Sequence, residues 1–149
     1  MEKHLVVFTD GGARGNPGPA ACAFVIKDEK GGLVVEKGMV IGRQTNNIAE
    51  YTGVVEALKW LKSHVDVCGK TPRITFFLDS KLVVNQLNGI FKIKNSGLRE
   101  LIVVVRKLER EIGGEFFYRF VPREKNQRAD FLVNKALDES RAKLFTYLA

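Results

Sequence analysis

Four acidic residues stand at places in the sequence where a carboxylate can do chemistry. Asp10 and Asp79 each end a run of mostly apolar residues, whereas Glu50 and Asp130 each fall near the start of an amphipathic segment. Clustered carboxylates repel one another, and burial beside apolar surface is costly unless a cation compensates their charge. A hard divalent cation such as Mg²⁺ prefers oxygen ligands, and a pair of such ions can promote phosphodiester cleavage. The four acids therefore suggest a metal-dependent site.

Each of the four acids also has an ordinary structural explanation. Glu50 could form a capping box with Asn47, because a Glu three residues after a helix cap reaches back to its N–H. Asp79 could cap the helix that follows it, and Asp130 could interact favourably with a helix macrodipole. Asp10 precedes a glycine and could be a turn residue. The pattern of residues alone leaves both interpretations open.

The hydrophobic pattern indicates the elements that must position these acids. Predicted strands cover 5–10, 20–27, 33–41, 74–78 and 115–121, and predicted helices cover 47–64, 80–88, 96–112 and 126–143. Three consecutive strands favour an antiparallel meander, and the later alternation of strands and helices adds parallel strands. We therefore expect an α/β fold with a mixed five-stranded sheet flanked by helices. If the first and fourth strands are adjacent, Asp10 and Asp79 lie side by side.

Length and charge narrow the class of protein. The 149 residues fit a single domain, 1–149, in which 140–149 could form a C-terminal tail. No apolar run approaches the roughly 20 residues that span a bilayer, and the start does not resemble a signal peptide, so we expect a cytoplasmic protein without membrane contact. The 24 Lys and Arg against 17 Asp and Glu give a net charge of +7. A basic domain suits a polyanionic partner such as nucleic acid.

Two further features have no assigned role. Cys22 lies in an apolar run and Cys68 in a predicted loop. Neither has a second cysteine or a histidine at metal-ligand spacing, so we expect two free thiols. A disulfide between them is the alternative that the sequence leaves open. The segment Ser140–Ala149 could dock on the core or remain mobile. Its apolar residues are Leu144, Phe145, Tyr147 and Leu148.

Four motifs in the chain are together similar to those of the type 1 ribonuclease H (ribonuclease HI) family. They are TDGGARGNPGP at 9–19, TNNIAE at 45–50, LDS at 78–80 and VPREKNQRAD at 121–130. Each motif is short, but four in this order are specific, and the resemblance extends from about Leu5 to Leu137. It implies the ribonuclease H-like fold, in agreement with the element order above.

The resemblance also implies an activity. Members of the family are endoribonucleases that hydrolyse the RNA strand of RNA–DNA hybrids by two-metal-ion catalysis and leave 5′-phosphate and 3′-hydroxyl ends. The family pattern makes Asp10, Glu50, Asp79 and Asp130 the catalytic metal ligands, with Mg²⁺ as cofactor and Mn²⁺ as an alternative ion. The implied substrate-binding residues are Gly11, Asn16, Thr45, Asn46, Asn47, Ser80 and Arg123. Neutral hydrogen-bonding groups suit a minor groove in which ribose 2′-hydroxyls distinguish RNA from DNA.

The chain departs from the family pattern in two respects. Many members carry a histidine in the loop before the fourth acid, where this chain has Arg123 and no histidine. Arginine stays protonated and cannot act as a base, but it can bind a phosphate through two hydrogen bonds; a solvated charge is the other interpretation. The segment FKIKN at 91–95 is too short for the basic, tryptophan-rich handle of some members, and we expect no separate hybrid-binding domain. Affinity for a hybrid is then expected to depend on single charges such as Arg14, Lys81, Lys92 and Lys94, for each of which a solvated surface charge is the other interpretation.

Two other functions fit the same fold. One is a catalytically idle nucleic-acid-binding module, but a binder of polyanions gains nothing from four clustered acids. The other is a related polynucleotidyl transferase, such as an integrase or a Holliday-junction resolvase, which the TNNxxE segment and the short chain disfavour. We expect a monomer with no obligate protein partner.

Overall fold

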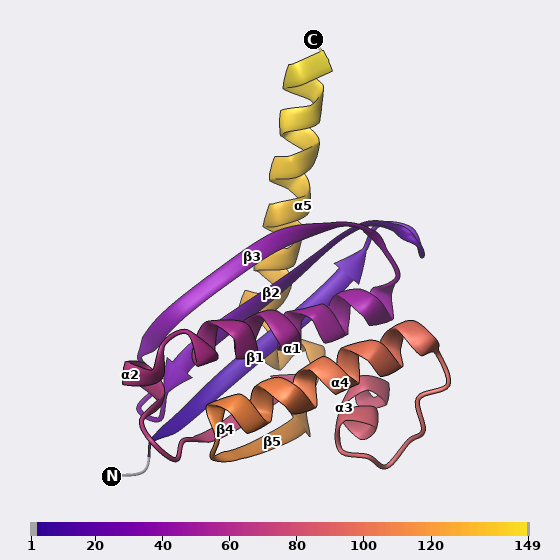
Figure 1. The fold of residues 1–149 in the computed structure, drawn as a ribbon. Coiled ribbons are helices and arrows are strands. Elements are labelled where there is room, and N and C mark those ends of the chain that lie inside the picture. Colours follow the sequence, from indigo (N-terminus) through magenta and orange to yellow (C-terminus); the bar gives the residue numbers. More distant parts are fainter. Residues whose placement is uncertain (1–2, 149) are drawn as a thin grey trace.

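The computed structural model describes residues 3–148 as a central sheet with helices on both faces (Figure 1). In chain order its elements are β1 (His4–Ala13), β2 (Gly18–Asp28), β3 (Leu33–Gln44), α1 (Asn46–Lys62), α2 (Val65–Cys68), β4 (Arg73–Leu78), α3 (Lys81–Leu87), α4 (Ser96–Ile112), β5 (Glu115–Phe120), the 3₁₀ turn η1 (Arg123–Lys125) and α5 (Gln127–Leu148). Among these described residues, no helix combines the length and apolarity needed to cross a membrane.

The sheet has the predicted mixed topology. Its strand order is β3-β2-β1-β4-β5. The pairs β1–β2 and β2–β3 are antiparallel, and β1–β4 and β4–β5 are parallel. The parallel register pairs Phe8 of β1 with Phe77 of β4. Asp10 and Asp79 each follow two residues later, so neighbouring strands carry them to the same edge of the sheet.

Two hydrophobic cores lie on opposite faces of the sheet. The larger core packs α1, α3 and α4 against one face, and the smaller core packs the first half of α5 against β1 and β2 on the other (Figure 1). The start of α1 comes very close to β1 at Gly11. A Cβ atom at Gly11 would lie 2.2 Å from the carbonyl carbon and oxygen of Ala49. Glycine at this position therefore lets α1 bring the neighbouring Glu50 up to Asp10.

The structure corrects four details of the sequence prediction. Strand β1 continues past Asp10 to Ala13, because that part still pairs with β2. Cys68 is not in a loop: it ends α2 and is buried, and both cysteines are free as expected. Glu50 lies in the second turn of α1 and not in the first, because the helix begins at Asn46. The last helix does not stop near residue 143 but runs to Leu148; Ala149 lies outside the described residues.

Candidate active site

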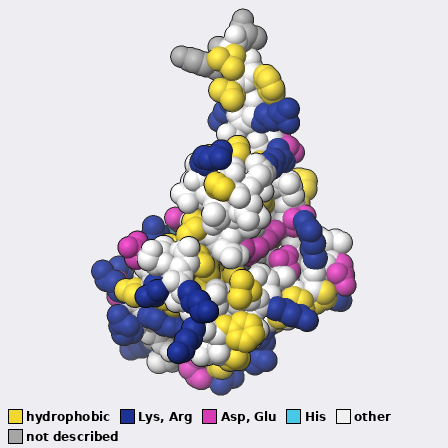
Figure 2. Space-filling view, turned by 90° about the vertical axis from the view of Figure 1, so that its right-hand side faces the viewer, with side chains coloured by type: hydrophobic (Ala, Val, Ile, Leu, Met, Phe, Trp, Pro, Cys, Tyr) yellow, Lys and Arg dark blue, Asp and Glu magenta, His cyan; other side chains and the backbone are white. Residues whose placement is uncertain are grey.

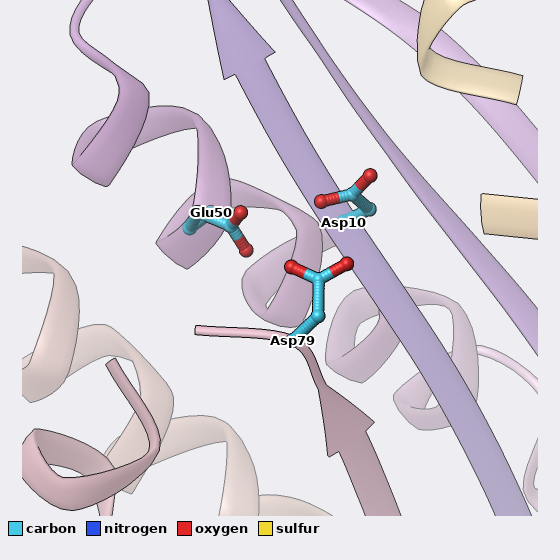
Figure 3. Close-up of side chains that lie close together, drawn as sticks. All are labelled: Asp10, Glu50 and Asp79. Atoms are coloured by element: carbon cyan, nitrogen blue, oxygen red, sulfur yellow. The ribbon is translucent and has the colours of Figure 1, made fainter. Parts of the chain in front are cut away.

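Three carboxylates from distant parts of the sequence meet at the edge of the sheet. Asp10 comes from β1, Glu50 from α1 and Asp79 from the residue after β4, and they point toward one another (Figure 3). One carboxylate oxygen from each lies within 4.8 Å of the others. Asp10 is 6% exposed and Glu50 9%, whereas Asp79 is half-buried. The parallel register of β1 and β4 and the glycine contact with α1 together produce this arrangement.

The helix caps exclude two of the ordinary explanations for these acids. Thr45 is the N-cap of α1, and its hydroxyl accepts from the Ile48 N–H at 3.2 Å. Glu50 is therefore too far along the helix to form a capping box. Ser80, and not Asp79, is the N-cap of α3, and its hydroxyl accepts from the Val83 N–H at 3.3 Å. Neither Glu50 nor Asp79 is needed to begin its helix.

The electrostatics of the cluster show that it lacks a compensating charge. Burial, and after it the charge of the nearby Asp79, raise the pKa of Asp10 to about 7. Burial also raises the pKa of Glu50 well above its usual range, with Asp10 and Asp79 as the next causes. The Oε2 atom of Glu50 is buried and has no hydrogen-bond partner among the described residues. Three crowded carboxylates with an unpaired oxygen fit a divalent cation, which would supply both charge and ligand contacts.

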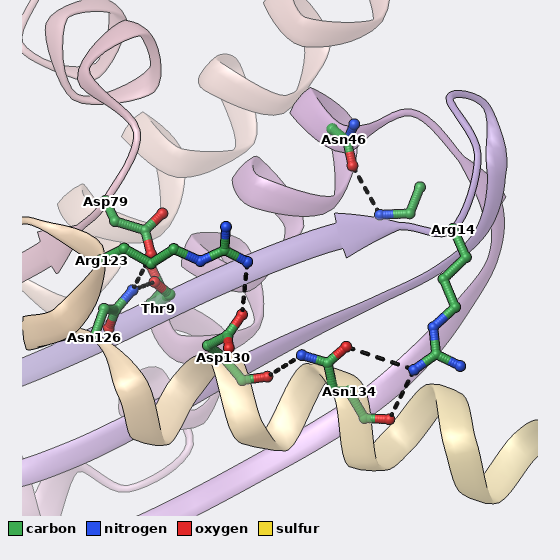
Figure 4. A network of polar contacts seen from close by, with 9 residues as sticks. Thr9, Arg14, Asn46, Asp79, Arg123, Asn126, Asp130 and Asn134 are labelled. Carbon is green, nitrogen blue, oxygen red and sulfur yellow. Dashed lines mark hydrogen bonds and ion pairs between the residues drawn. The ribbon is translucent and has the colours of Figure 1, made fainter.

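Asp130 lines the same cavity but is not part of the close group of three. The cavity has a volume of about 360 Å³, and Asp130 lies on its α5 side together with Asn134. Arg123 forms an ion pair with Asp130 at 3.5 Å (Figure 4). Asp130 lies in the first turn of α5, where a carboxylate interacts favourably with the helix macrodipole. This interaction is compatible with a metal-binding role.

Asn126 is a site residue for which the sequence predicted no role. It is 1% exposed, and its Nδ2 donates to the Thr9 carbonyl at 2.8 Å and to Asp79 Oδ2 at 3.2 Å (Figure 4). These bonds tie the start of α5 to β1 and hold one acid of the cluster. Asn126 stands inside the fourth motif, but an asparagine among polar residues at the start of a predicted helix gives no sign of burial.

The predicted substrate-binding residues divide into two groups. Gly11, Asn46 and Arg123 line the acidic cavity, whereas the remaining four do not. Those four are Asn16, Thr45, Asn47 and Ser80. Asn16 is nevertheless linked to the cavity, because its Oδ1 accepts from the Asn46 N–H at 2.9 Å, and Asn46 Oδ1 accepts from the Ala13 N–H at 2.9 Å.

The surface around the cavity carries mixed charge. Figure 2 shows this face: acidic side chains gather below the projecting helix, and Lys and Arg side chains lie around them. Lys81 is exposed at the start of α3, and its Nζ lies 5.0 Å from the centre of the Phe120 ring. Lys92 and Lys94 are exposed in the connection from α3 to α4. A negative centre within a basic surround suits a metal ion and a polyanion together.

Comparison with known proteins agrees with this geometry. The family model described as "Reverse transcriptase-like" matches residues 8–136. Ribonuclease HI of Halobacterium salinarum is 38% identical over 137 residues, which are 89% of this chain and 64% of that protein. The bifunctional protein Rv2228c of Mycobacterium tuberculosis is 38% identical over 135 residues, 90% of this chain but only 35% of its own length. The chain thus spans about a third of the latter relative.

A solved structure gives the same result in three dimensions. The crystal structure of LC11-RNase H1 in complex with RNA/DNA hybrid superposes with a TM-score of 0.86 at 40% sequence identity. The match covers 91% of this chain and 98% of that one. The likeness therefore extends over nearly the whole fold.

Proposed function

The chain belongs to the ribonuclease H family, and from this premise we propose that it is a divalent-metal-dependent endoribonuclease that hydrolyses the RNA strand of RNA–DNA hybrids. The products are RNA ends with 5′-phosphate and 3′-hydroxyl groups. The observation that carries the proposal is the meeting of Asp10, Glu50 and Asp79 with oxygen atoms within 4.8 Å of one another. A pure nucleic-acid binder has no use for such a concentration of negative charge.

The acidic residues would hold the metal. Asp10, Glu50 and Asp79 are the ligands that the geometry supports best, and Asp130 would contribute from the other side of the cavity. Mg²⁺ suits all-oxygen ligands and keeps several waters, and Mn²⁺ is an alternative. Bound divalent ions supply a water of lowered pKa and neutralise charge on the leaving oxygen. Because Asp10 and Glu50 have raised pKa values, a bound metal ion would favour their ionised forms.

Arg123 would position a phosphate of the substrate at the rim of the cavity. Its side chain is 79% exposed, and its only ion-pair partner among the described residues is the carboxylate of Asp130. The exposed guanidinium could turn from Asp130 to a phosphodiester, for which its planar fork is well suited. In this proposal Arg123 substitutes for the loop histidine in phosphate binding but moves no proton.

Asn16 in the β1–β2 connection and Asn46 at the start of α1 would select the hybrid. Asn16 and Asn46 each use the side-chain oxygen within the fold, which fixes the amide and leaves its N–H₂ group as donor. Donors of this kind contact 2′-hydroxyls and sugar oxygens in a minor groove without reading the base sequence. The structure of LC11-RNase H1 bound to an RNA/DNA hybrid supports the same substrate class.

Cleavage of labelled oligonucleotides tests the proposal. A hybrid should be cut in Mg²⁺ and left intact in chelator, and single-stranded RNA and duplex DNA should be cut far more slowly. End analysis should find 5′-phosphate on the product. Equal degradation of hybrid and single-stranded RNA would exclude the ribonuclease H assignment, and hybrid binding with no cleavage in any divalent metal would favour the idle module.

A further inference from the structure

One face of the sheet is only partly covered by helices. Helices α1, α3 and α4 pack against the other face, where the larger core lies. On this face α5 is the covering helix, and its contacts with the sheet are concentrated on β1, β2 and β3. The surface of β4 and β5 on the α5 side of the sheet therefore remains open.

The side chains on this open surface are largely aromatic. Successive strand residues point to opposite faces, and Phe76 and Tyr118 belong to the larger core, so Phe77 and Phe117 point to the open side. Phe8 of β1 lies next to Phe77 in the parallel register, and their rings are stacked with centres 5.3 Å apart. Phe8, Phe77 and Phe117 are all half-buried, so part of each ring contacts water.

Positively charged side chains lie beside these rings. The Nζ atom of Lys27 on β2 is 5.6 Å from the centre of the Phe8 ring. The guanidinium carbons of Arg73 and Arg119 are each 6.0 Å from the centre of the Phe117 ring. The three cations come from β2, from the start of β4 and from β5, so they border the aromatic rings on different sides.

The charge at this surface is net positive. Arg73 pairs with Glu115 at 3.7 Å, and Glu115 is the acidic residue of β5. Lys27 and Arg119 form no ion pair within the part of the chain that the structure describes. Flat apolar rings between cations suit a polyanion that carries planar groups of its own.

We propose that this surface, here called the aromatic face, binds single-stranded DNA. It consists of Phe8, Lys27, Arg73, Phe77, Phe117 and Arg119. Unpaired bases can stack on aromatic rings and guanidinium planes while cations hold the phosphates, whereas the bases of a duplex are already stacked on one another. Deoxyribose suits these rings better than ribose, because a 2′-hydroxyl against them would lack a hydrogen-bond partner. This binding goes beyond hybrid cleavage and does not depend on it.

The aromatic face lies close to the acidic cavity but is separate from it. Phe8 and Phe77 each stand two residues before Asp10 and Asp79, which is about 7 Å along each strand. Neither Phe8 nor Phe77 lines the cavity. A DNA strand on the aromatic face would therefore lie near the acids without occupying their site.

Binding of a labelled single strand without secondary structure, such as oligothymidylate, tests the proposal. Fluorescence anisotropy in chelator should show binding by the full chain that weakens with salt. Phe117→Leu keeps an apolar side chain but removes the ring, so the affinity should fall roughly fivefold or more. Phe145→Leu is the matched control, because Phe145 is 58% exposed on α5, and it should bind like the wild type. No binding by the wild type, or equal affinities for the two variants, would overturn the proposal.

A charge variant gives a second test that does not involve a half-buried side chain. Arg119 is exposed, and Arg119→Gln should reduce the slope of log affinity against log salt concentration by about 0.7. Arg110→Gln removes the same charge from an exposed position on α4, at the other face of the sheet, and should reduce the slope much less. Equal slopes for the two variants would overturn the assignment to the aromatic face.

Two further measurements test the location and the sugar. Amide chemical shifts should change at 75–77 and 117–119 when the strand is added, and changes confined to the acidic cavity would overturn the proposal. An RNA strand of matching sequence should bind more weakly, and equal or tighter binding of RNA would overturn the choice of DNA. Thermal unfolding checks that each variant is folded. Hybrid cleavage by Phe117→Leu should be unchanged and reports separately on the nuclease function.

Discussion

The side chain of Asn126 donates one hydrogen bond to Asp79 Oδ2 at 3.2 Å and another to the Thr9 carbonyl at 2.8 Å. A buried amide therefore connects the β5–α5 loop to the two strands that carry Asp10 and Asp79. The contact orients an acid of the proposed metal site without contacting the metal itself. Asn126 is a positioning residue.

Replacement of Asn126 by alanine should affect both stability and metal binding. Removing the amide leaves the buried Thr9 carbonyl without this donor, which costs about 1–3 kcal/mol of unfolding free energy. Asp79 also becomes free to turn, so Mg²⁺ or Mn²⁺ should bind more weakly by calorimetry. Gln127→Ala, which changes an exposed amide in the next residue, is the control and should alter both quantities much less. Unchanged metal affinity in folded Asn126→Ala would contradict the positioning role.

The acidic cluster should make the metal-free protein less stable as the pH rises. The pKa of Asp10 is about 7 in the folded chain against an ordinary value of 3.8, so between these values the folded state holds a proton that the unfolded chain has lost. The contribution is full below about pH 4 and declines toward pH 7, by on the order of 4 kcal/mol at most. Asp10→Asn should remove this decline.

Denaturant unfolding in chelator, measured at several pH values, checks this expectation. The stability of Asp10→Asn relative to the wild type should increase from pH 4 to pH 7. Added Mg²⁺ should stabilise the wild type near pH 7 and have little effect on the variant. Parallel pH profiles for the two proteins would show that Asp10 has an ordinary pKa.

Glu50→Gln should separate metal binding from folding. The caps of α1 do not involve Glu50, and a neutral amide in its buried position avoids the cost of an ionised carboxylate. Stability without metal should therefore be unchanged or higher, whereas hybrid cleavage should fall by orders of magnitude. Glu56→Gln on the same helix is the control. If Glu50→Gln cleaves like the control at moderate Mg²⁺, Glu50 is not a ligand.

Arg123→Ala should lower activity with little effect on stability. The Arg123–Asp130 pair is largely exposed on the arginine side, and such pairs stabilise a fold by less than about 1 kcal/mol. A charge-assisted bond to phosphate contributes about 1.5–3 kcal/mol, so the specificity constant should fall roughly tenfold or more. Lys125→Ala in the same 3₁₀ turn is the control. Equal kinetics for the two variants would leave Arg123 as a solvated charge.

Much of the fold and the core of the site followed from the sequence, for physical reasons. The mixed five-stranded sheet followed from hydrophobic periodicity and element order, whereas the approach of Asp10 to Asp79 was expected only if the first and fourth strands are adjacent, a condition that the β1–β4 pairing meets. The start of α1 was misplaced by one residue because Thr45 and Asn47 are both good caps, and the structure uses Thr45. Asn126 was missed because its partners, Asp79 and the Thr9 carbonyl, are distant in the sequence.

The basic connection between α3 and α4 should supply part of the affinity for a hybrid in place of the missing handle. Lys92 and Lys94 are exposed there, and Lys81 begins the adjacent helix. Each phosphate contact adds about 0.9 to the slope of log affinity against log salt concentration. Changing Lys92 and Lys94 to alanine should therefore weaken hybrid binding and reduce that slope by up to about 2.

Binding is best measured in chelator with Asp79→Asn as background, so that no cleavage occurs. The double change Lys30→Ala with Lys70→Ala removes the same charge at the opposite end of the sheet, because Lys30 lies in the β2–β3 turn and Lys70 precedes β4. Long-range attraction alone would change both doubles alike, since it depends mainly on net charge. Direct contact predicts a reduced slope only for Lys92 and Lys94. If the two double variants have the same salt slope, the α3–α4 connection does not contact the hybrid. The affinity of the protein for the hybrid then depends on the residues around the acidic cavity.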